Sequence, residues 1–122
     1  MTSPKKYRGK KEFYLVLTKC IEAAKKQKTL TYKDIAELMP GVPEDGGHYM
    51  ANETGAMAGA ISKEMDENGN PMLSALIVHS GDGKPGEGFY KLAKDLDKFE
   101  DGDDKEKFWQ NELNQVYDYW MK

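Results

Sequence analysis

Residues 31–41 read TYKDIAELMPG, and this stretch with the residues after it decides the expected fold. Thr31 is a good helix N-cap, and Asp34, three positions later, places a carboxylate where it stabilises a helix N-terminus. Pro40 and Gly41 should end this short helix, because neither residue continues a helix readily. A loop rich in Gly, Pro and Asp follows as far as Gly47. The stretch therefore predicts a short helix followed by a turn.

Three further helices are expected around this turn. The next one should run from about His48 to Glu67, and its many Ala and Gly residues would permit close approach to a neighbouring helix. An earlier helix is predicted from Lys11 to about Lys28, because apolar residues recur there at helical spacing. A last helix is predicted from Lys105 to Trp120, where aromatic and aliphatic residues form one stripe.

Between the third helix and the last, the composition suggests a β-hairpin. Residues 72–79 are rich in Leu, Ile and Val and predict a strand, residues 80–88 are rich in turn formers, and Phe89 and Tyr90 would begin a return strand. Leu92, Ala93 and Leu96 suggest a short helix after it. The expected fold is α+β: a winged helix-turn-helix of three helices and a β-hairpin wing, with an additional C-terminal helix.

Length and charge indicate one domain with a basic N-terminal arm. The 122 residues are enough for one core, so we expect a flexible arm over residues 1–10 and a single domain over residues 11–122. The formal net charge of −3 hides an asymmetry, because residues 1–28 hold nine Lys or Arg and two acidic residues. No apolar run approaches the ~20 residues of a membrane span, and no secretory signal is apparent. These features predict a soluble, cytoplasmic protein.

Few residues suggest catalysis or a metal site. Cys20, the single cysteine, lies on the apolar stripe of the first helix, where it is expected to fill the core. His48 and His79 are too few and too scattered for a zinc site. Residues 81–86 match Gly-x-Gly-x-x-Gly, but Pro85 interrupts the helix that a dinucleotide fingerprint needs. We therefore expect no enzyme activity, no cofactor and no metal.

Part of the chain resembles the C-terminal winged-helix domain of the alkylguanine-DNA alkyltransferases and their alkyltransferase-like relatives. The resemblance covers residues 31–92 and is carried by short motifs: TYKDIA at residues 31–36, Gly55, Gly59, Pro71, Asp82-Gly83 and Gly86-x-Gly-Phe89. It implies that the third helix enters the DNA minor groove. The reactive Cys-His pair of that family is absent, because residues 71–78 read PMLSALIV. The whole chain also resembles a family of small, uncharacterised bacterial and phage proteins, which implies no known activity.

Two functions follow as hypotheses. The first is a non-catalytic DNA-binding module, with the third helix at a groove and cations on phosphates; its expected contacts are Lys5, Lys6, Arg8, Lys10, Lys11, Asn52, Lys63 and Lys84. Four acidic residues in the third helix, Glu53, Glu64, Asp66 and Glu67, oppose this hypothesis. The alternative is a protein-interaction module, a phage or bacterial inhibitor or regulator that binds a host or defence protein. Its contacts would be Trp109, Tyr117 and Trp120.

Overall fold

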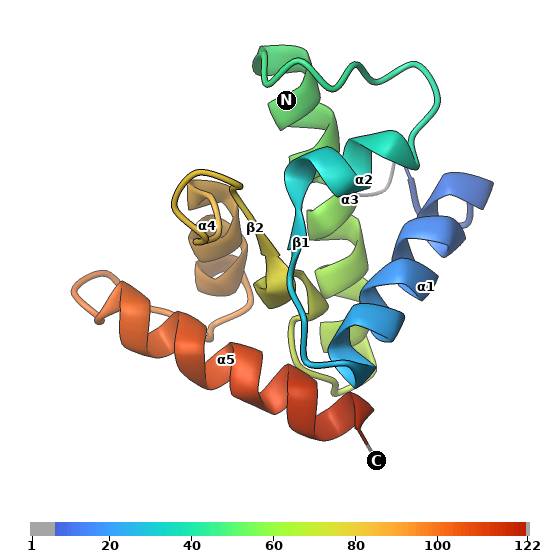
Figure 1. Ribbon diagram of the computed structural model, residues 1–122. Helices are drawn as coiled ribbons and strands as arrows, with labels where there is room; N and C mark the ends of the chain where they lie inside the picture. The colour runs from blue at the N-terminus through green and yellow to red at the C-terminus, as the bar shows by residue number, and fades with distance from the viewer. Residues whose placement is uncertain (1–6, 122) are drawn as a thin grey trace.

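The computed structural model describes residues 7–121, which form an α+β fold dominated by helices (Figure 1). In chain order the elements are α1 (Lys11–Lys25), β1 (Leu30–Thr31), α2 (Tyr32–Glu37), α3 (His48–Glu67), the 3-10 helix η2 (Leu73–Leu76), β2 (Ile77–Val78), α4 (Glu87–Asp95) and α5 (Lys105–Trp120). The helices predicted at residues 48–67 and 105–120 are confirmed with those bounds. No helix in the described part of the chain is both long and apolar enough to cross a membrane.

The helix ends follow from local chemistry. The Thr31 hydroxyl accepts a hydrogen bond from the Asp34 backbone N–H at 3.1 Å, and the Asp34 carboxylate accepts one from the Thr31 N–H at 2.9 Å. This capping box satisfies two backbone donors at the start of α2. Asp104 caps α5 in a similar way, because its carboxylate accepts from the Lys107 N–H at 3.0 Å. The starts of α2 and α5 are therefore each determined by residues within one helical turn.

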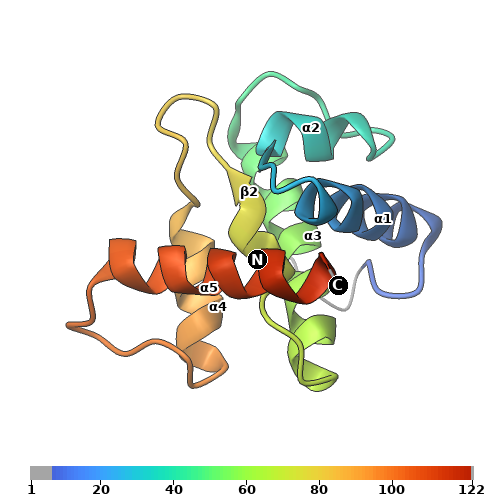
Figure 2. The same ribbon diagram turned by 60° about the horizontal axis from the view of Figure 1, so that its bottom comes forward.

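Helix α3 lies at the centre of the fold. It packs against α1, α2, η2 and α4, while α5 runs across η2 and α1 at one end of the molecule (Figures 1 and 2). The largest fully buried side chains include Phe13 of α1, Ile35 of α2, Met57 and Ile61 of α3, and Val116 of α5. One continuous core thus joins the two ends of the chain through α3.

The expected β-hairpin is wrong. The strand predicted over residues 72–79 is reduced to Ile77–Val78, which pairs in parallel with Leu30–Thr31. Side chains bind the preceding backbone instead: Glu112 accepts from the Met72 N–H, Ser62 accepts from the Ser74 N–H, and the Trp109 indole donates to the Ala75 carbonyl. Because these side chains form hydrogen bonds with backbone groups of Met72, Ser74 and Ala75, those backbone groups do not require a partner strand.

The expected return strand is also wrong. Phe89 and Tyr90 belong to α4, in which Phe89, Tyr90 and Ala93 are buried together on one side. Residues 79–86, between β2 and α4, form a loop that projects from the core in both views (Figures 1 and 2). The short helix expected near Leu92 is correct but begins five residues earlier, at Glu87.

The expected arm divides into two parts. Residues 1–6 lie outside the described residues, so the prediction of a flexible arm is not tested there. At residues 7–10 Tyr7 is buried in the core cluster and Arg8 contacts α3, whereas Gly9 and Lys10 are exposed. We call residues 7–10 the N-terminal segment.

Candidate nucleic-acid interface

Several positions of α3 are open to solvent, and four of them form a row along one side of the helix. Asn52 and Gly55 are exposed, and Gly59 and Lys63 are half-buried. These positions recur every three or four residues, so they share one side of the helix; we call them the α3 stripe. A Cβ atom at Gly55 or Gly59 would meet no neighbouring atom within 4 Å. The helix backbone itself therefore forms the surface at the middle of the stripe.

The two polar members of the stripe are free for an external contact. Within residues 7–121, neither Asn52 nor Lys63 makes a side-chain hydrogen bond or an ion pair. An Asn amide both donates and accepts hydrogen bonds, and a Lys ammonium binds phosphate as a point charge. Asp66, three residues beyond Lys63, is half-buried and brings a negative charge to this end of the stripe.

Three of the four acidic residues that oppose DNA binding contact the N-terminal segment, whereas Asp66 lies at the end of the stripe. Glu53 is buried, and its carboxylate accepts a hydrogen bond from the Tyr7 hydroxyl. Burial, followed by the neighbouring Glu53, raises the pKa of Tyr7, so the phenol stays protonated and continues to donate. The first of the three acidic side chains is thus enclosed beneath the N-terminal segment.

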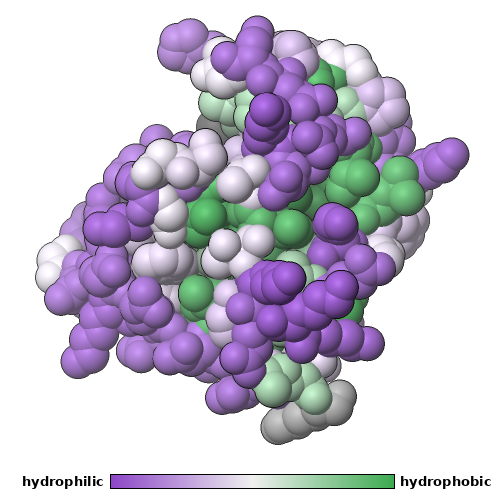
Figure 3. Space-filling view, viewed as in Figure 1, coloured by the Kyte–Doolittle hydropathy of each residue, from purple (hydrophilic) through white to green (hydrophobic). Residues whose placement is uncertain are grey.

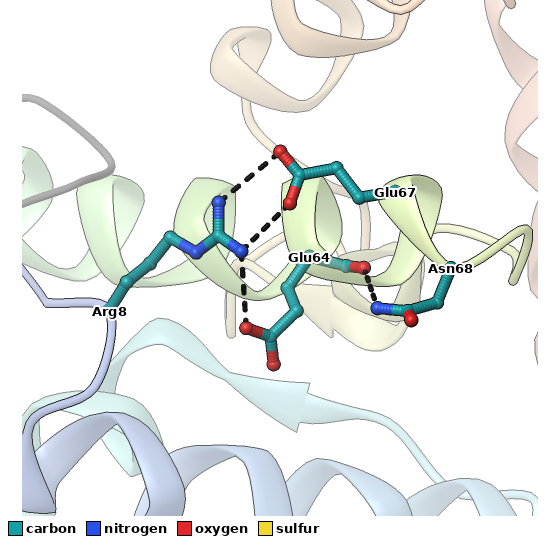
Figure 4. A network of polar contacts seen from close by, with 4 residues as sticks. All are labelled: Arg8, Glu64, Glu67 and Asn68. Atoms are coloured by element: carbon teal, nitrogen blue, oxygen red, sulfur yellow. Dashed lines mark hydrogen bonds and ion pairs between the residues drawn. The ribbon is translucent and has the colours of Figure 1, made fainter.

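Arg8 holds the other two acidic side chains (Figure 4). Its guanidinium lies 3.2 Å from the Glu64 carboxylate and 2.8 Å from that of Glu67. The hydrogen bond to Glu67 is the main cause of the raised pKa of Arg8. Beside this pair the Asn68 amide donates to the Glu64 carbonyl at 2.8 Å and closes the end of α3. One guanidinium thus pairs with two carboxylates, which leaves α3 with a net negative charge and engages a side chain that the sequence suggested as a phosphate ligand.

The other predicted phosphate contacts are scattered. Lys5 and Lys6 lie outside the described residues, and Lys10 and Lys11 are exposed at the start of α1. Lys84, in the 79–86 loop, is exposed and lies 3.6 Å from the Glu106 carboxylate. Both side chains of that pair are more than half exposed, so the pair is worth little and leaves Lys84 largely accessible.

The 79–86 loop is fixed to α2 at its base. The His79 ring packs on the Tyr32 ring with centroids 4.8 Å apart, and the Tyr32 hydroxyl accepts from the Gly86 N–H at 3.1 Å. A Cβ atom at position 86 would lie 3.1 Å from the His79 ring, which explains a glycine there. This anchor sets the position of the loop relative to the α2–α3 pair.

The aromatic stripe of the alternative hypothesis is largely internal. Trp109 is buried and its indole N–H donates to the Ala75 carbonyl at 2.8 Å. Tyr117 and Trp120 are half-buried against the core. The Trp120 indole nitrogen is itself buried and finds no acceptor among the described residues. A protein partner would meet only the outer edges of Tyr117 and Trp120.

Among residues 7–121, the side chains considered for nucleophilic catalysis or metal binding do not form a site. Cys20 is fully buried, and burial raises the pKa of its thiol to about 12, so at neutral pH it is not the thiolate that a nucleophile requires. His79 serves the loop anchor, and His48 is exposed at the start of α3. Among residues 7–121, no three His, Cys, Asp or Glu side chains gather as metal ligands do.

Sequence reasoning missed one feature. The docking of Tyr7 and Arg8 on α3 joins residues more than 40 positions apart, and no local sequence pattern predicts it. The lysines on the outer face of the first helix were expected from the spacing of its apolar residues. Comparisons of the chain with protein-family models, with curated proteins and with solved structures find no match.

Proposed function

We propose that this chain is a non-catalytic module that binds duplex DNA, with the α3 stripe placed in a groove. The observation that carries the proposal is the separation of charge on α3. Glu53, Glu64 and Glu67 are held by Tyr7 and Arg8, and the stripe offers solvent an amide, two glycines and a lysine. Arg8 offsets one of the four negative charges of α3, and Asp66 remains beside Lys63.

The arrangement around α3 supports this proposal. Helices α2 and α3 follow each other as in a helix-turn-helix, in which the second helix meets DNA, although the longer loop of residues 38–47 takes the place of the short turn. The 79–86 loop, fixed to α2 through Tyr32, occupies the place in the chain that a wing takes in the winged helices that the sequence resembles. The wing-like role is thus proposed for a loop, with Lys84 exposed on it.

The chemistry of the stripe suits close contact with DNA. Gly55 and Gly59 present no side chain, so the helix backbone can approach base edges or sugars closely. Asn52 would read a base edge through its amide, and Lys63 would bind a phosphate beside it. Lys10 and Lys11 would add phosphate contacts at the start of α1.

The proposal that the protein is non-catalytic rests on the residue types found at positions 71–78. In the resembled alkyltransferases a Cys-His pair lies in the segment that corresponds to residues 71–78, and neither residue type occurs there. Met72 to Val78 are all buried, so this segment offers no accessible side chain to a substrate. DNA would be bound and left chemically unchanged.

The test is a titration of labelled duplex DNA with the wild type and with Gly55→Glu. The glutamate meets open space and improves helix propensity, so the fold should be kept or stabilised by about 0.5–1 kcal/mol. In the complex its bulk and charge would face phosphate, and affinity should fall at least tenfold. Gly55→Ala is the matched control; it adds one methyl group and no charge.

Salt and a second variant sharpen the test. Each phosphate contact should contribute a slope of about −0.9 to log K against log salt, so three contacts predict a slope near −3. Asp66→Asn should raise affinity, because it removes the acidic charge next to Lys63. Absence of duplex binding at low salt would overturn the proposal. Unchanged binding by Gly55→Glu would remove α3 from it.

A further inference from the structure

The outer face of α1 near its C-terminal end carries an accumulation of lysines that the α3 stripe does not include. Lys19, Lys25 and Lys26 are exposed on the helix and at its C-cap, and Lys28 is exposed shortly after it; we call these four residues the lysine cluster. Their side chains are open to solvent, whereas Val16, Cys20 and Ala24 of the same helix are buried. The four lysines therefore lie on the surface and do not contribute to the packing of the core.

The lysines of the cluster form no ion pairs within the part of the chain that the structure describes. Among residues 7–121, no carboxylate lies within 4.0 Å of any of its four ammonium groups. Four lysines later in the chain differ, since Lys84, Lys94, Lys98 and Lys105 each have a carboxylate partner. Glu22 is the exposed acid on this part of α1. A net positive surface remains for an external anion.

The cluster surrounds a shallow hollow. Lys19, Lys26 and Lys28 line an open depression of about 180 Å³, together with Glu22 and the apolar side chains of Ala23 and Leu30. Three ammonium groups around one hollow can contact one phosphate or two adjacent phosphates of a backbone. The hollow thus gives the lysines a common point of approach.

We propose that the lysine cluster binds the phosphate backbone of duplex DNA, as a second contact apart from the α3 stripe. The inference rests on the proposed DNA-binding function. It adds a second DNA-binding surface, which is separate from the α3 stripe. A duplex carries one negative charge per about 1.7 Å along its axis, so several phosphates face the cluster at once.

The composition of this surface favours phosphate over a protein partner. Apolar side chains are exposed on the N-terminal half of α1, where Tyr14 is 54% and Leu15 45% exposed. From Thr18 to Thr29 every exposed side chain is polar or charged. Figure 3 agrees, with hydrophobic atoms over the start of α1 and hydrophilic side chains near its end. Protein interfaces are depleted in lysine and enriched in aromatic residues at their centre, the opposite of this composition.

The test compares two double variants of equal charge in the full chain. Lys26→Gln/Lys28→Gln removes two members of the cluster, and Lys91→Gln/Lys107→Gln removes two exposed lysines on α4 and α5 that also make no ion pair within residues 7–121. Glutamine keeps the helix propensity of lysine, and circular dichroism checks the fold of each variant.

The cluster variant should bind a 20-base-pair duplex about tenfold more weakly at 0.1 M salt. Its salt slope should be shallower by about two, one for each phosphate that a lysine no longer neutralises. The control variant should bind within twofold of the wild type. In the opposite direction, Glu22→Gln should strengthen binding. Weakening confined to the cluster variant supports the inference.

Other outcomes separate the two proposals. If the wild type binds duplex, Gly55→Glu does not, and both lysine variants bind alike, the cluster is not a contact and the α3 proposal stands. If the wild type does not bind duplex, both proposals fail. If polyglutamate competes with duplex for the cluster at equal charge concentration, the surface binds any polyanion and the assignment to DNA is overturned.

Discussion

The two ends of the chain pack on the same core but treat their charged residues in opposite ways. After residue 80, Lys84, Lys94, Lys98 and Lys105 each pair with a carboxylate, and Lys98 reaches the buried Glu112. Near the other end the lysine cluster of α1 has no such partner among residues 7–121. Lys98 therefore supports the core, whereas the exposed pairs at the same end contribute little, and mutations of Lys98 and of the lysine cluster should separate stability from binding.

Glu112→Ala should have the largest effect. The Glu112 carboxylate accepts from the Met72 N–H at 2.8 Å and from Lys98 at 3.1 Å, and the side chain is only 4% exposed. Its removal leaves a buried N–H without an acceptor and should lower the free energy of unfolding by about 3 kcal/mol. Urea denaturation measures the change. Glu106→Ala, which breaks only an exposed pair with Lys84, should change it by less than about 0.5 kcal/mol.

Tyr7→Phe tests the N-terminal segment and should cost about 1–2 kcal/mol, because buried Glu53 is deprived of a hydrogen-bond donor. The raised pKa of Tyr7 also predicts a pH dependence. Its contribution to stability is complete below about pH 10, where the unfolded phenol begins to ionise, and declines as pH rises further.

The difference in unfolding free energy between wild type and Tyr7→Phe should therefore shrink as pH rises above about 10. Denaturation at pH 8 and at alkaline pH provides the comparison. A difference that stays constant over this range would show that the Tyr7–Glu53 contact does not depend on the protonated phenol.

The smallest effects compare one lysine from each end. Lys98→Gln should cost about 1 kcal/mol, because it removes the cation beside Glu112, whereas Lys26→Gln should change stability by less than about 0.3 kcal/mol. Thermal unfolding measured for the two variants side by side tests this difference. Equal destabilisation would mean that α1 lysines also stabilise the fold, and the contrast between the two ends would not hold.

Prediction succeeded where the relevant contacts are local. The start of α2 was predictable because Thr31 and Asp34 cap it within one turn, and α5 was predictable from its stripe of apolar residues. The hairpin failed because the fate of residues 72–75 depends on Ser62, Trp109 and Glu112, which lie 12 to 40 positions away. A run of Leu, Ile and Val marks burial, but it does not tell a strand from a buried 3-10 helix.

The candidate interface also was predictable only where its features depend on local sequence. Asn52, Gly55, Gly59 and Lys63 could be placed on one side of a helix from their spacing, and the basic character of the first 28 residues could be counted. Which acids of α3 would be bound by other side chains could not be known, because Tyr7 and Arg8 reach Glu53, Glu64 and Glu67 only in the folded chain.

The amino-acid sequence alone determined the helices, their caps and the uneven distribution of charge, because these depend on interactions within a few residues. Only the tertiary structure decided that Leu30–Thr31 would pair with Ile77–Val78, that three acidic residues of α3 would be held by the N-terminal segment, and that the α1 lysines would remain without carboxylate partners among residues 7–121. These outcomes require distant segments to meet. Packing of the core selects them, and the local pattern of residues does not encode them.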